Sequence, residues 1–196
     1  SLSGPVRLIC REARPDRLLA DLAMHDLDVI LTDAPASPHV KIRAFNHLLG
    51  SSGVAFFGRA GLASRYRRNF PASLHGAPML HPAENTMMRR SLEQWFESHN
   101  IRPVVLGEFD DGALLKAYGH RGIGIFPASV VIAKEIEAQY KVRWIGNASG
   151  IRESLYAITV ERRIKHPSVA ALCRAASAFS SGVRAQSDSS VPSGGG

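Results

Sequence analysis

Apolar and polar residues near the start of the chain follow a pattern that predicts a strand, a helix and a second strand. Pro5–Cys10 has the composition of a short strand, and the apolar run Leu27–Leu31 has the length of a buried one. Between them, Arg14–His25 places several apolar residues on one helical face, namely Leu18, Leu19, Leu22 and Ala23. We therefore expect a βαβ unit with two parallel neighbouring strands and a right-handed crossover.

Small residues interrupt the pattern after this unit. Gly50–Gly53, with the sequence GSSG, separates the mixed segment Val40–Leu49 from the apolar run Val54–Phe57. Glycine permits backbone conformations that other residues avoid, so the break predicts a hinge between two lobes. From Gly58 to Ala77 the chain is rich in arginine, proline and glycine and shows little periodicity, which predicts mostly loop with one short helix.

The rest of the chain repeats the alternation of strands and helices that is typical of an open, parallel α/β sheet. Thr86 is a good N-cap for a helix that runs to about Ser98, and Asn100 is a suitable stop. Gly119 is expected to close a shorter helix that ends at Tyr118. The other predicted strands are Pro78–Leu80, Arg102–Leu106, Gly122–Pro127, Val142–Ile145 and Leu155–Thr159, with a loop at Gly146–Gly150 and helices at Ala128–Ala138 and from Pro167 onward.

The composition is that of a soluble protein with a buried core. The chain has 196 residues, of which 45% are hydrophobic, enough for one domain or two small lobes. Its longest apolar stretches are far shorter than the roughly 20 residues of a membrane span, and Ser1–Arg11 lacks the pattern of a secretory signal. We therefore expect a cytoplasmic protein that does not bind a membrane. The polar segment 183–196 is expected to be a disordered tail.

The chain is basic, with a net charge of +7 that comes from 19 arginines and only 5 lysines. Basic pairs occur at Arg67-Arg68, Arg89-Arg90 and Arg162-Arg163. A nucleic-acid site that stacks bases would interleave several aromatic residues with these cations, and only Tyr66 lies among them. The pattern favours a solvated, arginine-rich surface over a nucleic-acid site, which stays open as the alternative.

Residues that carry catalysis or bind metals show no recognisable arrangement. The eight histidines lack the spacing of a zinc site, which needs three or four converging ligands. No nucleophile elbow of the form G-x-S-x-G occurs, and the glycines near Gly122 precede a strand rather than a dinucleotide-binding helix. Cys10 and Cys173, on a predicted core strand and a predicted core helix, are expected to stay reduced. We therefore expect no metal, no cofactor and no enzyme activity.

One cluster of acidic residues does suggest a site. Glu108, Asp110 and Asp111 come where a predicted strand ends and a helix begins, and open α/β sheets bind ligands at this carboxyl edge. An aspartate that caps the helix explains one of the three carboxylates without any ligand. Three close carboxylates repel one another unless a positive group or a proton joins them. The cluster is therefore either a helix start or part of a binding site.

Several segments carry a family resemblance. Arg17–Leu19, His25–Asp33 and Gly53–Phe57 resemble the regulatory domain of LysR-type transcription activators. Leu106–Gly119 and Ile125–Pro127 look like the branch of this family that activates sodium/proton antiporter genes. Further similar segments are Tyr156–Ile158, Glu161-Arg162 and His166-Pro167, so that the resemblance covers about residues 6–180.

The resemblance implies an α/β fold of two lobes, like that of the type 2 periplasmic binding proteins, with a hinge of two crossing strands. Residues 1–52 with 151–182 would form the first lobe, and residues 53–150 the second. A small-molecule or ion effector would lie between the lobes and change how a homodimer sits on DNA. The segments that line this site in the family fall on Arg11, Arg14, Thr32, Asp33, Glu108, Phe109, Asp110, Asp111, Ile123 and Gly124.

The family begins with elements that have no counterpart in this sequence. They are a winged helix-turn-helix, a linker helix, and the first strand and helix of the sensing domain, so the resemblance implies an incomplete first lobe and DNA binding only through a domain outside this chain. The chain is either a fragment of a longer protein or a truncated product. The alternative function is that of a transport-type solute-binding protein of the same architecture, against which the lack of a secretory signal argues.

Overall fold

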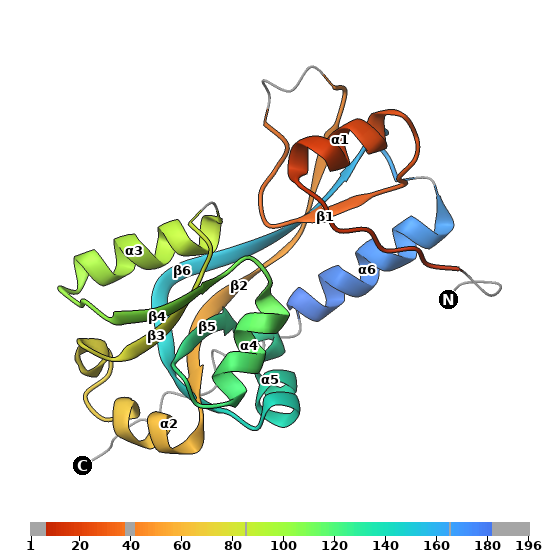
Figure 1. Cartoon of the computed structure of the whole chain (residues 1–196). Helices are drawn as coiled ribbons and strands as arrows, with labels where there is room; N and C mark the ends of the chain where they lie inside the picture. Colours follow the sequence, from red (N-terminus) through yellow and green to blue (C-terminus); the bar gives the residue numbers. More distant parts are fainter. Residues whose placement is uncertain (1–6, 38–41, 85, 165, 182–196) are drawn as a thin grey trace, which may run out of the picture. The chain divides into compact units, whose positions relative to one another are not determined.

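The computed structural model describes residues 7–37, 42–84, 86–164 and 166–181 (Figure 1). The chain divides into two compact units: unit 1 comprises residues 1–51 and 154–196, and unit 2 comprises residues 52–153. The lobe limits that the family resemblance implies, at residues 52 and 151, stay predictions. The expected tail at 183–196 lies outside the described residues.

Two long strands pass from one unit to the other. They are β2 (Phe45–Gly58) and β6 (Arg143–Thr159), which lie in a sheet of order β1-β6-β2-β5. Gly50–Gly53, the predicted hinge, lies inside β2 at the point where the chain passes from unit 1 to unit 2. The predicted loop at Gly146–Gly150 is wrong, since this segment lies inside β6. The hydrogen bonds of neighbouring strands hold small residues in an extended conformation that their own preferences would not select. Gly150 still has a positive φ, +92°, a conformation that glycine adopts more readily than other residues.

Unit 1 is built around the short strand β1 (Ile30–Thr32). This strand pairs antiparallel with β6, with Ile30 opposite Ile158. Helix α1 (Pro15–Ala23), which was predicted, packs Leu19 and Leu22 against this pair. Helix α6 (Pro167–Ser181) also begins at the predicted proline, and its Val169 and Cys173 are buried with Leu49 and Ala157.

The described part of the predicted first strand, residues 7–10, forms no strand. Residues 7–10 are exposed and have no regular structure, so the expected βαβ unit is wrong, and so is the burial expected for Cys10. An extended segment becomes a strand only when a neighbour takes up its backbone hydrogen bonds. Among the described residues, β1 finds that neighbour in β6, and residues 7–10 find none.

Unit 2 holds most of the regular structure. Strands β3 (Pro78–Pro82) and β4 (Val104–Phe109) are parallel, as predicted, and Ile125 adds a parallel bridge to Met79. Strand β5 (Phe126–Ser129) instead pairs antiparallel with β2. The helices of this unit are α2 (Ala60–Arg67), α3 (Met87–Ser98), α4 (Gly112–His120) and α5 (Ala133–Tyr140), with short 3-10 turns η1 (Ala72–Leu74) and η2 (Val130–Ile132).

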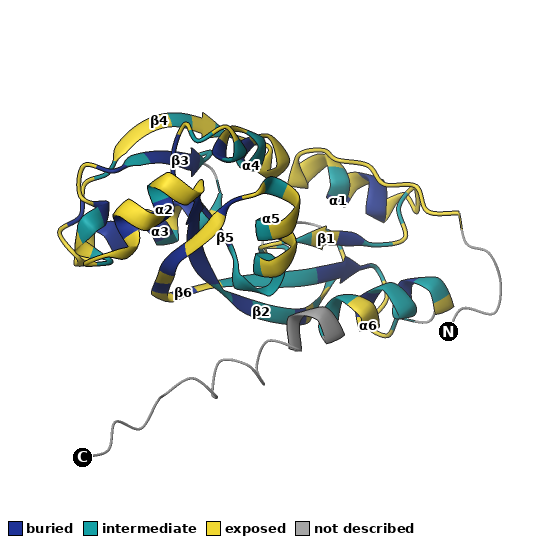
Figure 2. Cartoon of the chain, turned by 90° about the horizontal axis from the view of Figure 1, so that it is seen from below, coloured by how far each residue is buried: buried dark blue, intermediate teal, exposed yellow. Residues whose placement is uncertain are grey.

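Side chains alternate along the strands of unit 2 and form two cores. Phe56 and Met79 pack with residues of α2 and α3, whereas their neighbours Phe57 and Leu80 pack with residues of α4 and α5. The buried positions accordingly follow β2, β3 and β5, while β4 and the outer faces of the helices are exposed (Figure 2). The strands of unit 2 thus lie between two helical layers, the arrangement that an α/β sheet requires.

The helix ends were partly predictable. Thr86 caps α3 as expected, its Oγ1 accepting a hydrogen bond of 3.1 Å from the Arg89 N–H, and Asn100 beyond the last turn has a left-handed φ of 53°. Gly119 does not close α4, which continues to His120. A Cβ at Gly119 would lie 2.2 Å from the Phe126 ring. This glycine therefore serves close packing of α4 on β5 rather than helix termination.

Candidate functional site

The acidic residues predicted to form a site lie where β4 ends and α4 begins. In the parallel pair of β3 and β4, Glu108 lies opposite His81 and Phe109 lies opposite Pro82. Successive residues of a strand point to opposite faces of the sheet. Glu108 and Phe109 therefore point to opposite faces of the sheet, and the residues of the cluster have different surroundings.

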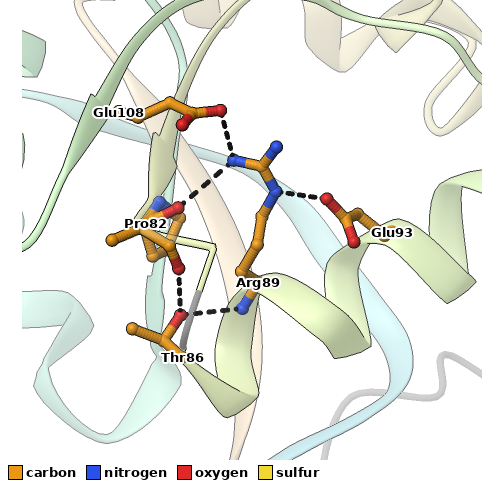
Figure 3. Close-up of polar contacts among 6 residues, drawn as sticks. Pro82, Thr86, Arg89, Glu93 and Glu108 are labelled. Carbon is orange, nitrogen blue, oxygen red and sulfur yellow. Dashed lines mark hydrogen bonds and ion pairs between the residues drawn. The ribbon is translucent and has the colours of Figure 1, made fainter.

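Glu108 reaches a buried arginine on α3. Its Oε1 accepts a hydrogen bond of 2.8 Å from Arg89 Nη1, while Arg89 Nε binds Glu93 Oε1 at 2.5 Å (Figure 3). Arg89 Nη1 also donates to the Pro82 carbonyl over 3.3 Å. Burial by itself lowers the pKa of Arg89, but its hydrogen bonds to the two glutamates outweigh burial and raise that pKa above its usual value. Arg89 is thus a permanent cation that neutralises Glu108.

Asp111 is the N-cap of α4. Its Oδ1 accepts hydrogen bonds from the N–H groups of Ala113 at 2.6 Å and Leu114 at 3.4 Å, which satisfies two of the four unpaired donors at a helix start. Phe109 is taken up by packing, with its ring centroid 5.1 Å from that of Tyr118 on α4. Neither residue needs a ligand to explain its position.

Asp110 is the carboxylate that remains. It is exposed, and it forms no hydrogen bond or ion pair with the part of the chain that the structure describes. The positive group that joins the predicted acidic cluster is Arg89, which pairs with Glu108, while Asp111 caps α4. What the carboxyl edge of β4 offers to a ligand is one carboxylate with the α4 N-terminus next to it.

The loop before β5 supplies the last two predicted residues of unit 2. Gly124 is buried against β3, where an added Cβ would lie 3.0 Å from Leu80 Cγ and 3.1 Å from the Pro78 carbonyl oxygen. A larger side chain there would have to displace these neighbours slightly. Ile123, by contrast, is 41% exposed and presents its side chain to solvent.

The four predicted site residues of unit 1 lie on exposed segments at the ends of α1 and β1. Arg14 is the N-cap residue of α1 and forms a solvent-exposed ion pair of 3.5 Å with Asp16. Thr32 is the last residue of β1, and its Oγ1 accepts a hydrogen bond of 3.3 Å from the Ala34 N–H. Arg11 and Asp33 are exposed.

Sequence reasoning missed a buried histidine next to Arg89. His81 is 3% exposed, and neither of its ring nitrogens has a hydrogen-bond partner among the described residues. Burial, and then the charge of Arg89, lower its pKa to about 4, so the ring is neutral at ordinary pH. His81, Arg89 and Glu93 border an open cavity of about 490 Å³ between α3 and the start of β4. Nothing in the local sequence signals this, because His81 comes from β3 whereas Arg89 and Glu93 come from α3.

The described residues contain neither a metal-binding cluster nor a helix that could cross a membrane. No group of three or more histidine, cysteine, aspartate or glutamate side chains is arranged to hold a metal ion within them. No helix in the same ranges has the length and apolar character that crossing a membrane requires.

Comparison with known proteins gives a consistent result. A family model for the LysR substrate binding domain matches residues 5–180. The transcriptional activator protein NhaR of Escherichia coli (strain K12) is 35% identical over 169 residues, which make up 86% of this chain and 55% of that protein. NhaR of Shigella flexneri gives the same values. The chain thus spans about half the length of the curated relatives that it matches.

Solved structures agree on the fold. The apo-form regulatory domain of HypT from Salmonella typhimurium has a TM-score of 0.63 at 16% identity, covering 85% of this chain and 80% of that one. The reduced regulatory domain of OxyR2 from Vibrio vulnificus has a TM-score of 0.62 at 12% identity, covering 86% and 79%. The predicted fold class, an α/β fold like that of the type 2 periplasmic binding proteins, is confirmed.

Proposed function

Because this chain belongs to the LysR substrate-binding domain family, we propose that it is the effector-sensing domain of a transcription activator of sodium/proton antiporter or ion-stress genes. The observation that supports this most is the 35% identity with NhaR, which is named a transcriptional activator, over 86% of the chain. In this proposal the DNA is bound by another domain of the whole regulator. The transport-type alternative has no support from the relatives found.

The effector contacts the carboxyl edge of unit 2 through Asp110 and Ile123. This edge is the expected place for a ligand, because open α/β sheets bind ligands beyond the carboxyl ends of their strands. Asp110 is an exposed carboxylate there that has no partner among the described residues, and the first turn of α4 follows directly. The exposed residues Arg11, Arg14 and Asp33 and the half-buried Thr32 are the contacts that we propose in unit 1, and the effector is a small molecule or an ion.

Self-association is part of the proposal. Strand β4 is at the edge of its two-stranded sheet, and Val104, Val105 and Leu106 on it are 51%, 43% and 52% exposed. An exposed apolar edge strand is a site for association with another chain unless it is covered. We propose that a second copy of this domain covers it in a homodimer.

A chimera tests the proposed function. Residues 5–180 replace the matching part of E. coli NhaR, and a reporter gene under the promoter that NhaR activates measures the response to sodium chloride, with potassium chloride at the same ionic strength as the control. We expect induction by sodium and little response to potassium. A chimera that accumulates in cells but leaves the reporter flat over all sodium concentrations would contradict the proposal.

A further inference from the structure

The end of unit 2 that lies away from Asp110 is basic. Helix α4 begins directly after Asp111 and ends directly before Arg121. At 1.5 Å per residue it is about 14 Å long, so Arg121 lies at the opposite end of the helix from the aspartates. Arg59, at the start of α2, donates a hydrogen bond of 3.3 Å to the His120 carbonyl. Arg67, in the last turn of α2, donates to the Trp144 carbonyl. Helix α2 therefore spans from the end of α4 to the start of β6 (Figure 1).

We call this region the basic end. It carries seven exposed cationic side chains, Arg59, Arg65, Arg67, Arg68, Arg121, Lys141 and Arg143. The three segments that supply them, residues 58–83, 117–125 and 138–149, contain no aspartate or glutamate. Glu137 comes just before the last of these segments, and its carboxylate accepts a hydrogen bond of 2.9 Å from the Trp144 N–H. The field at this end is therefore strongly positive.

Helix dipoles explain only part of this charge. A cation near a helix C-terminus is stabilised by the dipole, and α2, α4 and α5 all end in this region. One cation for each helix would use three of the seven. The remaining four repel one another and raise the free energy of the folded protein at low salt, which an anionic partner would relieve.

Some of these guanidinium groups are held in place. Arg67 lies over the Trp144 ring at 5.4 Å, and Arg65 lies over the Tyr66 ring at 5.3 Å. Stacking limits the rotamers that each side chain samples, so less entropy is lost when the group binds an anion. A guanidinium presents paired N–H donors that match the oxygens of a phosphate. Six of the seven cations are arginines, whose guanidinium groups bind phosphate oxygens in pairs.

We propose that the basic end contacts the phosphate backbone of duplex DNA without reading its sequence. This surface belongs to the sensing domain itself and adds to whatever sequence-specific binding the regulator has elsewhere. The proposal does not depend on the identity of the effector. Binding through phosphates releases counterions, so it must weaken steeply as salt rises.

Two triple variants of the 196-residue chain test the proposal. One removes three cations from the basic end, as Arg65→Gln, Arg68→Gln and Arg143→Gln. The matched control removes three exposed cations from unit 1, as Arg7→Gln, Arg43→Gln and Arg174→Gln, and so has the same net charge. Each set contains one arginine stacked on an aromatic ring, Arg65 over Tyr66 and Arg43 over Phe45. Circular dichroism and thermal melting confirm that both are folded.

Fluorescence anisotropy with a random-sequence duplex of about 30 base pairs, from about 50 to 200 mM potassium chloride, measures binding. We expect the basic-end variant to bind at least about ten-fold more weakly at the lowest salt, with a plot of log K against log salt less steep by about 2 to 3, since each phosphate contact contributes roughly 0.9 to that slope. The control should stay close to the parent. Equal weakening of both variants, no binding by the parent, or displacement of the duplex by poly-glutamate as effective as by unlabelled duplex would overturn the proposal.

Discussion

Arg89 on α3 and Glu108 on β4 form an ion pair of 2.8 Å that holds the helix to the carboxyl end of the strand. The same guanidinium donates to the Pro82 carbonyl at the end of β3. One nearly buried side chain, 10% exposed, thus joins three elements directly beneath the edge proposed to meet the effector. Arg89 fixes the position of that edge without offering a charge to a ligand, because Glu93 and Glu108 already neutralise it.

Replacing Arg89 should destabilise unit 2. Arg89→Leu leaves Glu93 and Glu108 without their shared cation, and the loss of a nearly buried partner costs about 2 to 4 kcal/mol. Glu108→Gln should cost about 1 kcal/mol or less, because the Glu108 side chain is 43% exposed and solvent screens it. Urea unfolding at neutral pH measures both. Arg90→Leu, at an exposed neighbouring position, is the control, and equal midpoints for Arg89→Leu and Arg90→Leu would contradict this role.

The sequence predicted those elements whose causes are local. Thr86 caps α3 three residues before the N–H that it accepts from, and Pro167 opens α6, so each start is determined by a few neighbouring residues. The long strands β2 and β6 were not predicted as continuous, because their small residues favour a turn when considered alone. Pairing with distant segments decided their structure, and no local pattern contains that information.

The candidate site follows the same division. That an aspartate caps α4 was foreseen from its neighbours, and Asp111 does so. The pairing of Glu108 with Arg89 joins positions 19 residues apart on different elements and required the register of β3 against β4. The sequence therefore shows three neighbouring carboxylates, of which the structure leaves one without a partner among the described residues.

His81 should make the protein less stable in mild acid. Its pKa is lowered to about 4 by burial and by Arg89, so between about pH 4 and its ordinary value of 6.5 the unfolded chain binds a proton that the folded chain does not. The resulting stability is fully present above pH 6.5 and is lost as pH falls through 4. The shift corresponds to at most about 3 kcal/mol.

His81→Leu isolates this contribution from other acid effects. The nearby charges of Arg89, Glu93 and Glu108 remain, while the two unpartnered nitrogens disappear. We expect the variant to be at least as stable as the parent at pH 7.5 and to lose less stability between pH 6.5 and 4.5 in urea unfolding. Identical pH dependence of parent and variant would show that His81 does not contribute to the loss of stability between pH 6.5 and 4.5.

A charge on β4 should block self-association. Val105→Lys places a cation on the exposed apolar strand, and in a two-fold symmetric contact it would face like charges at short range. Sedimentation velocity of the parent should show a concentration-dependent dimer, and the variant should need at least about ten-fold higher concentration to pair. Leu48→Lys, at a 61% exposed position on β2, is the matched control. A parent that stays monomeric at high concentration contradicts the proposed dimer.

The two neighbouring aspartates should separate stability from signalling. Asp111→Ala removes the cap of α4 and should cost about 1 kcal/mol, whereas Asp111→Asn should melt close to the parent because asparagine also caps helices. Asp110 forms no such bond with the described residues, so Asp110→Asn should leave the melting temperature unchanged.

The response to sodium should depend on Asp110, although the melting temperature does not. In the chimera with the E. coli NhaR DNA-binding part, Asp110→Asn removes the exposed carboxylate of the proposed effector edge, and the sodium concentration for half-maximal reporter activity should rise several-fold. Glu135→Gln removes an exposed charge on α5 of the same unit and should change nothing. Hard cations prefer oxygen ligands, so a direct ion effector would lose a ligand in the Asp110 variant. If that variant responds to sodium like the parent chimera, the acidic residues after β4 serve only to start α4 and to pair with Arg89.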